Sequence, residues 1–198
     1  MIAGIVLAAG QSRRMGRPKA LLPLRGATLL EHAVRALAGG GCRPVVVVTG
    51  PDTDDVARRI GDEARRLGAR VAVNPAADSE QVDSLRIGLA SLEEAATAAV
   101  VLPVDVPGAD ADAVRLVVDA FRERGAPVVR AVHEGRHGHP VLFARPLFAA
   151  FSTGTLPEGA RTVIHAHADR VEEVEAGGAG VLHDVDTPAD FRRAGGTA

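Results

Sequence analysis

Residues 2–9 (IAGIVLAA) begin the chain with an almost unbroken apolar run, and this run decides the fold. A short run that is apolar on both faces predicts a β-strand buried on both sides. Similar runs recur at 44–49 (PVVVVT) and 98–104 (AAVVLPV). Segments with the helical spacing of apolar residues separate the runs, which predicts a mostly parallel sheet covered by helices on both faces.

The same two patterns predict the order of elements along the chain. We expect strands at 2–9, 44–49, 70–73, 98–104, 127–132, 139–143, 171–175 and 180–186. We expect helices at 28–38, 52–67, 80–94, 110–124, 146–151, 159–168 and 188–193. Residues 1–198 should therefore form a single Rossmann-like domain with three α/β/α layers. Its irregular C-terminal third should add antiparallel strands to the mostly parallel sheet.

Composition excludes several classes of protein. The 198 residues carry a net charge of -2, and only 3% are aromatic with no Trp or Tyr, so we expect no nucleic-acid partner. The single cysteine, Cys42, leaves no disulfide framework and fits a reducing compartment. The sequence contains neither an apolar run of membrane-spanning length nor a secretory leader pattern. We therefore expect a cytoplasmic protein with no membrane partner.

The loop after the first strand, Leu7 to Lys19, has the composition of a phosphate-binding loop. It holds two spaced glycines, three arginines and the only lysine of the chain. Ligands of open α/β sheets lie at the carboxyl ends of strands, small residues allow backbone N–H groups to approach phosphate, and basic side chains neutralise it. Neither the Walker pattern nor G-x-G-x-x-G is present. The alternative is a solvated basic connection.

Two acidic segments follow predicted strands. Asp105 lies at the carboxyl end of 98–104, and Asp184 and Asp186 lie at the end of 180–186, where strand alternation would place both on one face. Carboxylates in such positions suit Mg²⁺, which substrate phosphates then complete. Asp105 could instead be a turn residue, and Asp186 a helix cap. Thr187, before Pro188 at the first helical position, is the better cap.

The segment 136–143 carries two histidines, His137 and His139, two residues apart. Without a cysteine partner this spacing is a weak metal signal. From the residues alone, a general base, a metal ligand and a polar turn all remain open.

From Leu7 to Leu24 the chain contains L-A-A-G-x-S-x-R-M-G-x-P-K-x-L-L-P-L, which resembles the signature of the MobA-like nucleotidyltransferases. Within that family the chain is most similar to the molybdenum cofactor cytidylyltransferases. The resemblance implies a fold of the nucleotide-diphospho-sugar transferase type and a loop that wraps a nucleoside triphosphate. Arg14 and Lys19 would stabilise the transferring phosphoryl group, and Ala9 favours cytidine because guanosine users tend to have L-A-G-G. The implied nucleotide-binding residues in this loop are Leu7, Ala8, Ala9, Gly10, Gln11, Ser12, Arg13, Arg14, Met15, Gly16 and Lys19.

Further segments extend the resemblance. Asp105 and Asp186 match family positions that hold the metal, with Asp184 as a ligand or a neighbour of one. Gly138, His139 and Pro140 match a segment near the acceptor substrate. Asn74, Ser84 and Gly88 match a segment that seats the nucleotide. Glu80 departs from that segment, because the family usually has glycine there.

The resemblance implies Mg-dependent transfer of CMP from CTP to the phosphate of molybdenum-molybdopterin, with catalysis by Arg14, Lys19 and Asp105. Pyrophosphate would leave, and the product would be handed over to a molybdenum hydroxylase. The same chemistry with another nucleotide or acceptor is an alternative: guanylyl transfer to molybdopterin, or a phospho-lactate, sugar phosphate or methylerythritol phosphate acceptor. A non-catalytic nucleotide- or cofactor-binding chaperone and a redox Rossmann domain belong to other classes. The sequence leaves the oligomeric state open.

Overall fold

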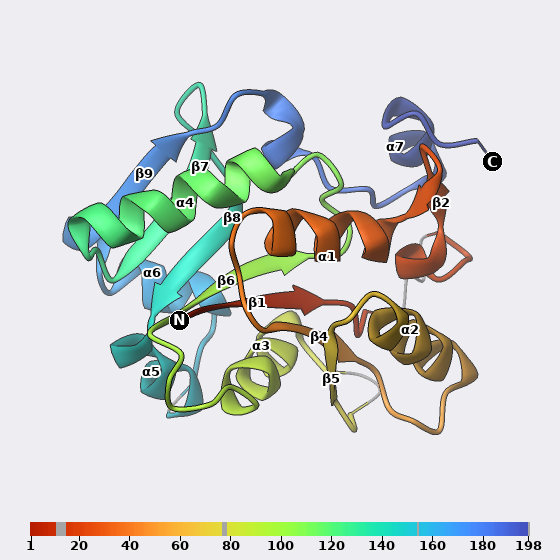
Figure 1. Cartoon of the computed structure of the whole chain (residues 1–198), viewed down its shortest axis with the longest axis horizontal. Helices are drawn as coiled ribbons and strands as arrows, with labels where there is room; N and C mark the ends of the chain where they lie inside the picture. The colour runs from red at the N-terminus through yellow and green to blue at the C-terminus, as the bar shows by residue number, and fades with distance from the viewer. Residues whose placement is uncertain (11–14, 77–78, 154, 198) are drawn as a thin grey trace.

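A seven-stranded sheet forms the centre of the molecule, in the order β5-β4-β1-β6-β8-β7-β9 (Figure 1). The structure is a computed structural model and describes residues 1–10, 15–76, 79–153 and 155–197. The strands of the sheet are β1 (Ile2–Leu7), β4 (Val45–Thr49), β5 (Arg70–Val73), β6 (Ala98–Pro103), β7 (Val128–His133), β8 (Arg136–Ala144) and β9 (Val171–Glu175). A separate two-stranded sheet pairs β2 (Pro23–Leu24) with β3 (Ala27–Thr28).

Helices cover both faces of the large sheet. They are α1 (Leu29–Gly39), α2 (Asp55–Arg66), α3 (Gln81–Ala90), α4 (Ala111–Arg124), α5 (Phe148–Ser152), α6 (Ala160–His165) and α7 (Pro188–Arg193). Short 3₁₀ turns add η1 (Lys19–Leu21), η2 (Arg145–Leu147), η3 (Ala168–Arg170) and η4 (Ala179–Leu182). The predicted three-layer α/β/α arrangement is confirmed.

Alternate residues of β1, β4 and β6 enter different cores, although these strands are apolar almost throughout. Val6 packs in one core with α1, α4 and part of α2, whereas Ile5 packs in the other with α3, α5 and α6. This alternation follows from the two-residue period of a strand, and both faces are apolar because helices cover both. The continuous run at the start of the chain thus produces a sheet that is buried on each side.

The parallel pattern of the sheet is broken at β8, as expected for the C-terminal third. β8 pairs antiparallel with β6 and with β7, while the β1–β4, β1–β6, β4–β5 and β7–β9 pairs are parallel. The mostly parallel sheet with an antiparallel addition was correctly predicted. β5 and β9 form its two edges.

The strand predicted at 180–186 is wrong. The chain there forms η4 and then continues without regular structure to Thr187, which caps α7 as expected, with Pro188 at the first helical position. A close backbone contact explains the difference, because a Cβ built on Gly108 would lie 2.5 Å from the Cα of Gly180. The Val185 N–H also donates to the Asp105 carbonyl at 2.7 Å. We call residues 179–187 the C-terminal strap, since they lie across the end of β6.

Helix boundaries follow the capping residues. α2 begins at Asp55, later than predicted, because the Asp54 carboxylate accepts the Val56 N–H at 2.8 Å. α1 begins after Thr28, whose hydroxyl accepts the Glu31 N–H at 3.1 Å. Among the described residues, none of the helices has both the length and the apolar character needed to cross a membrane.

Candidate active site

A cleft of about 710 Å³ opens at the carboxyl ends of β1, β4 and β6. Four parts of the chain surround it: the loop after β1, the connection from β4 into α2, the start of α3, and the residues that follow β6. This is the position at which open α/β sheets bind ligands. The lining residues from the predicted site are Leu7, Ala8, Ala9, Gly10, Gly16, Lys19, Ser84 and Asp105.

Four residues of the predicted nucleotide loop lie outside the described residues. They are Gln11, Ser12, Arg13 and Arg14, the last of which was also predicted to be catalytic. On either side of them the loop is described, and its end enters η1 through Pro18.

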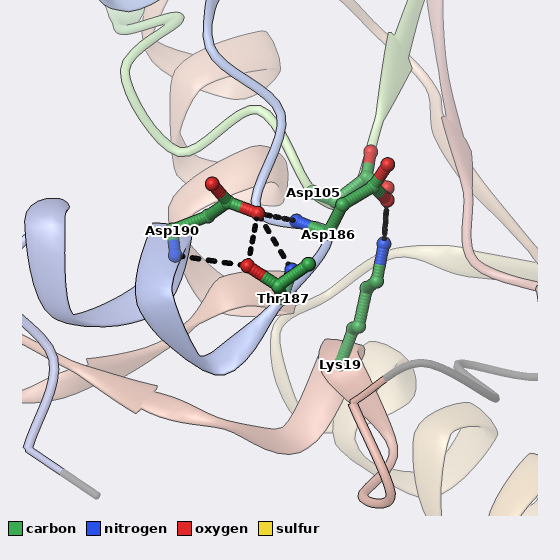
Figure 2. A network of polar contacts seen from close by, with 5 residues as sticks. All are labelled: Lys19, Asp105, Asp186, Thr187 and Asp190. Atoms are coloured by element: carbon green, nitrogen blue, oxygen red, sulfur yellow. Dashed lines mark hydrogen bonds and ion pairs between the residues drawn. The ribbon is translucent and has the colours of Figure 1, made fainter.

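Lys19 joins two acidic segments that lie far apart in the sequence. Its Nζ donates to Asp105 Oδ2 at 3.0 Å and to Asp186 Oδ1 at 2.5 Å, as Figure 2 shows. Burial alone would lower the pKa of Lys19, but the hydrogen bonds and charges of Asp186 and Asp105 outweigh it and raise that pKa. Lys19 is therefore a cation, and its one positive charge is shared between two carboxylates.

The start of α7 holds the backbone that carries Asp186. The Asp190 carboxylate accepts the Thr187 N–H at 2.7 Å, the Thr187 hydroxyl at 2.7 Å and the Asp186 N–H at 3.3 Å (Figure 2). These bonds lower the pKa of Asp190, with the Thr187 hydroxyl as the main cause, so the carboxylate stays charged. The capping box thereby fixes the end of the C-terminal strap beside Lys19.

Asp184 lies in the same electrostatic environment. Its pKa is raised, first by burial and then by the negative charges of Asp105 and Asp186, against the opposing effect of Lys19 and His183. The three predicted metal carboxylates therefore repel one another, and a cation is needed to keep them together.

Asp105 and Asp186 fit a hard divalent ion, because an oxygen of each reaches the same nitrogen of Lys19. Within the part of the chain that the structure describes, no group of three or more His, Cys, Asp or Glu side chains forms a ready metal cage. Mg²⁺ commonly binds one or two carboxylates and takes its other ligands from water and phosphate, so this donor set suits it.

Asn74 acts on the cleft through two serines. Its buried amide donates to Ser79 Oγ at 2.7 Å and to Ser84 Oγ at 3.0 Å, and both serines line the cleft. Its carbonyl oxygen accepts the Ala76 N–H at 3.0 Å. Asn74 thus anchors the cleft wall at the start of α3 and does not itself line it.

Two other predicted nucleotide-binding residues have packing roles. Gly88 allows α3 to approach β1, since a Cβ there would lie 2.8 Å from Ile5 Cγ2. Met15 is buried in the core beside α1. Neither residue is among those that line the cleft.

The predicted acceptor residues Gly138, His139 and Pro140 lie on β8, outside the cleft. Gly138 touches the C-terminal strap, because a Cβ there would lie 2.4 Å from the Val181 oxygen. The Nδ1 atom of His139 is buried and has no hydrogen-bond partner among the described residues. Burial lowers the pKa of His139 to about 4, aided by Arg161 and opposed by Asp105, so the imidazole is neutral near pH 7.

One wall of the cleft was not predicted from the sequence. Gly50, Pro51, Thr53 and Asp54, which follow β4, line it together with the first residues of α2. A signal was present, because β4 is parallel to β1 and its carboxyl end meets the same edge of the sheet. Glu80 also lines the cleft, as the N-cap residue of α3, where its N–H donates to Asp83 Oδ2 at 3.1 Å.

Comparison with known proteins places these features in a family. A family model described as the MobA-like NTP transferase domain matches residues 4–171. The chain is 33% identical over 206 residues to a protein of Paenarthrobacter nicotinovorans named nicotine blue oxidoreductase, which covers 97% of this chain and 95% of that protein. It is 60% identical over 47 residues to a probable molybdenum cofactor guanylyltransferase of Opitutus terrae, covering 24% of this chain and 23% of that protein.

Solved structures agree with this placement. Rv0371c from Mycobacterium tuberculosis H37Rv superposes with a TM-score of 0.83 at 28% identity, covering 98% of this chain and 97% of that one. A structure of Rv0371c in complex with manganese superposes with a TM-score of 0.76 at 27% identity, covering 98% of this chain and 97% of that one. The strap that carries Asp186 lies beyond the segment matched by the family model but within the length that these structures cover.

Proposed function

This chain belongs to the MobA-like NTP transferase family, and from that premise we propose that it transfers CMP from CTP to the phosphate of molybdenum-loaded molybdopterin. Nucleotidyl transfer itself follows from the family. One observation carries the proposal. The cleft is lined by a basic loop, and at the end of that loop Lys19 forms ion pairs with Asp105 and Asp186. A triphosphate needs this combination of cationic side chains and metal-binding carboxylates.

In the proposed reaction the acceptor phosphate attacks the α-phosphorus of CTP. A new P–O bond forms while the bond to the bridging oxygen breaks, and its electron pair leaves with pyrophosphate. Such a transfer depends on positioning and charge neutralisation, and an acceptor phosphate is already ionised near neutral pH. No side chain therefore has to remove a proton, which agrees with the lowered pKa of His139, because a pKa of about 4 makes its imidazole a weak base.

Each part of the site has a task in this proposal. Backbone N–H groups around Gly10 and Gly16, together with Lys19, hold the phosphates, and the serines anchored by Asn74 form the wall beside the nucleoside. Asp105 and Asp186 would hold Mg²⁺, which would supply positive charge beside the phosphates. The acceptor would bind at the end of β8 that carries Gly138 and His139, and the product would pass to a molybdenum hydroxylase.

Measured pyrophosphate release tests the proposal. CTP, GTP, ATP and UTP are supplied with Mg²⁺ and a molybdopterin acceptor, and we expect CTP to give the fastest release. The Lys19→Ala variant is compared with the parent protein, and circular dichroism checks that the variant is folded. Release that needs no acceptor, or a Lys19→Ala variant as active as the parent, would count against the proposal.

GTP is the second candidate nucleotide, because the Opitutus terrae relative with 60% local identity is named a guanylyltransferase. Ala9, which lines the cleft, favours CTP, since the resemblance links A-A-G to cytidine users. If pyrophosphate release is faster from GTP than from CTP, the proposed reaction becomes guanylyl transfer, with the same chemistry.

A redox activity is the second candidate function, because a relative that matches nearly the whole chain is named nicotine blue oxidoreductase. The ion pairs of Lys19 with two carboxylates favour phosphate chemistry instead. Incubation with nicotine blue and a reduced nicotinamide nucleotide separates the two. We expect no dye reduction above the rate without protein, and rapid reduction would favour the redox function.

A further inference from the structure

The ammonium group of Lys19 lies at the point where the two proposed metal carboxylates meet. Its nitrogen is 3.0 Å from Asp105 Oδ2 and 2.5 Å from Asp186 Oδ1, with 11% of the lysine side chain exposed. Charge pairs that are withdrawn from solvent are screened much less by salt than exposed pairs. In the protein alone, the lysine is thus the cation around which both carboxylates are arranged (Figure 2).

A divalent metal would compete with Lys19 for the same two carboxylates. Mg²⁺ binds carboxylate oxygens at about 2.0–2.1 Å in nearly octahedral geometry. An ammonium group bonded to those carboxylates would lie within a few ångströms of the ion, and like charges at such distances repel strongly. Metal binding therefore favours a position of Lys19 away from Asp105 and Asp186.

A bound nucleotide would offer Lys19 a further set of anionic partners. Lys19 and Asp105 both line the cleft, so the ammonium group that contacts the carboxylates also faces the space in which a nucleotide would bind. The phosphates of a bound nucleotide offer oxygens of the same charge and hydrogen-bonding character as the carboxylates. The lysine can then exchange one set of anionic oxygens for another, while the metal takes the first set.

We propose that Lys19 is the resident cation of this site, and that a divalent metal enters together with a nucleoside triphosphate, whose phosphates draw the lysine away from Asp105 and Asp186. The inference rests on the metal site of the proposed function. Metal and nucleotide then strengthen each other's binding, as linkage requires. In the free protein Lys19 offsets part of the negative charge of the two carboxylates.

The wild-type protein offers a direct test, because Lys19 is its only lysine. Lysine labelled with ¹³C at Cε gives one side-chain NMR signal, which can be followed during titration. We expect Mg²⁺ alone at millimolar concentration to leave the signal in place, and Mg²⁺ with CTP or GTP to shift it. An equal shift with Mg²⁺ alone, or none with either nucleotide complex, would overturn the proposal.

Affinity for Mn²⁺ without nucleotide gives a second test, measured by electron paramagnetic resonance. Removing the resident cation in Lys19→Met should tighten Mn²⁺ binding about tenfold or more. Arg17→Met removes the same charge from the same loop and cleft wall, and we expect a change below about threefold, because exposed charges are screened. Equal effects of the two variants would contradict a specific role of Lys19.

The double variant Lys19→Met, Asp105→Asn should lose the tighter Mn²⁺ binding of Lys19→Met. This loss would show that the gain in affinity arises at Asp105. If Lys19→Met does not fold, Lys19→Gln replaces it. These measurements require neither nucleotide nor turnover. If the protein does not transfer CMP, the proposed function is wrong, and the lysine exchange can still be measured. If Lys19→Met binds Mn²⁺ no more tightly than the parent, the lysine exchange alone is wrong.

Discussion

The two halves of the sheet build the candidate site in different ways. In the half formed by β5, β4, β1 and β6, parallel strands end at one edge and their loops surround the cleft. Beside the half formed by β8, β7 and β9, the C-terminal strap lies against Gly138 of β8 and against Gly108 in the connection after β6. Topology places the site residues of the first half, whereas close packing places those of the second. Substitutions should therefore affect the two halves differently.

The largest effect is expected at the junction of the halves, where Asp105 follows β6 and faces Lys19. Asp105→Asn should lower the rate of pyrophosphate release about a thousandfold, because it removes a charge worth several kcal/mol in the transition state. The fold should be retained, since the substitution keeps the shape of the side chain. Steady-state kinetics alongside a thermal melt measures both. Turnover within tenfold of the parent would show that the cleft half acts without this carboxylate.

The next largest effect, on stability, is expected when a methyl group is added to the C-terminal strap. A Cβ on Gly180 would lie 2.8 Å from the Gly108 oxygen, so Gly180→Ala should lower the free energy of unfolding by about 1–3 kcal/mol. Gly177→Ala is the matched control, because no heavy atom lies within 4 Å of its added Cβ. Urea unfolding compares the two proteins. Equal stability would mean that the strap is not held by this contact.

His139 should give the second half its own response to acid. Its native pKa is about 4 against an ordinary 6.5, so the unfolded chain takes up a proton first as the pH falls. The stability from the neutral imidazole is complete above pH 6.5 and is lost between pH 6.5 and pH 4. His139→Gln should remove this loss, about 2 kcal/mol, from a series of urea melts.

A histidine on the surface provides the control for that series. The His165 side chain is 65% exposed and its contact with Glu158 is also exposed, so His165→Gln should change stability much less than His139→Gln does. If His139→Gln and His165→Gln behave alike, the buried environment of His139 does not set the acid response of this half.

The smallest effect is expected at Glu80, in the cleft half. Glu80 is the N-cap residue of α3, and its backbone N–H is the group bonded to Asp83. Glu80→Gly should therefore change stability by only about 0.5 kcal/mol and leave the ratio of CTP to GTP use unchanged. Competition between the two nucleotides measures the ratio. A large change would show that the carboxylate at this position selects the base.

The same difference between the halves explains what the sequence could predict. Apolar runs and capping residues predicted β1, β4 and β6 and the Thr187 cap, because these features depend on local pattern and burial. The residues placed after strand ends by topology, Gly10 and Asp105 among them, do line the cleft. The wall after β4 was missed although the same rule applies to it.

The C-terminal strap could not be predicted in this way. Its apolar residues predicted a strand, and the two-residue period of a strand predicted that Asp184 and Asp186 lie on one face. The contact between Gly108 and Gly180 that replaces the strand joins distant residues and leaves no periodic signal. The neutral state of His139 likewise depends on burial by the folded chain.

The bond between Lys19 and Asp186 joins residues 167 positions apart in the chain, and this separation has a consequence during protein synthesis. A ribosome adds about 5–20 residues per second, so the glycine-rich loop emerges many seconds before Asp186 does. The Lys19–Asp186 pair can form only after residue 186 has been synthesised. A chain released early by a premature stop codon before residue 186 would contain the strands around the cleft but lack that carboxylate.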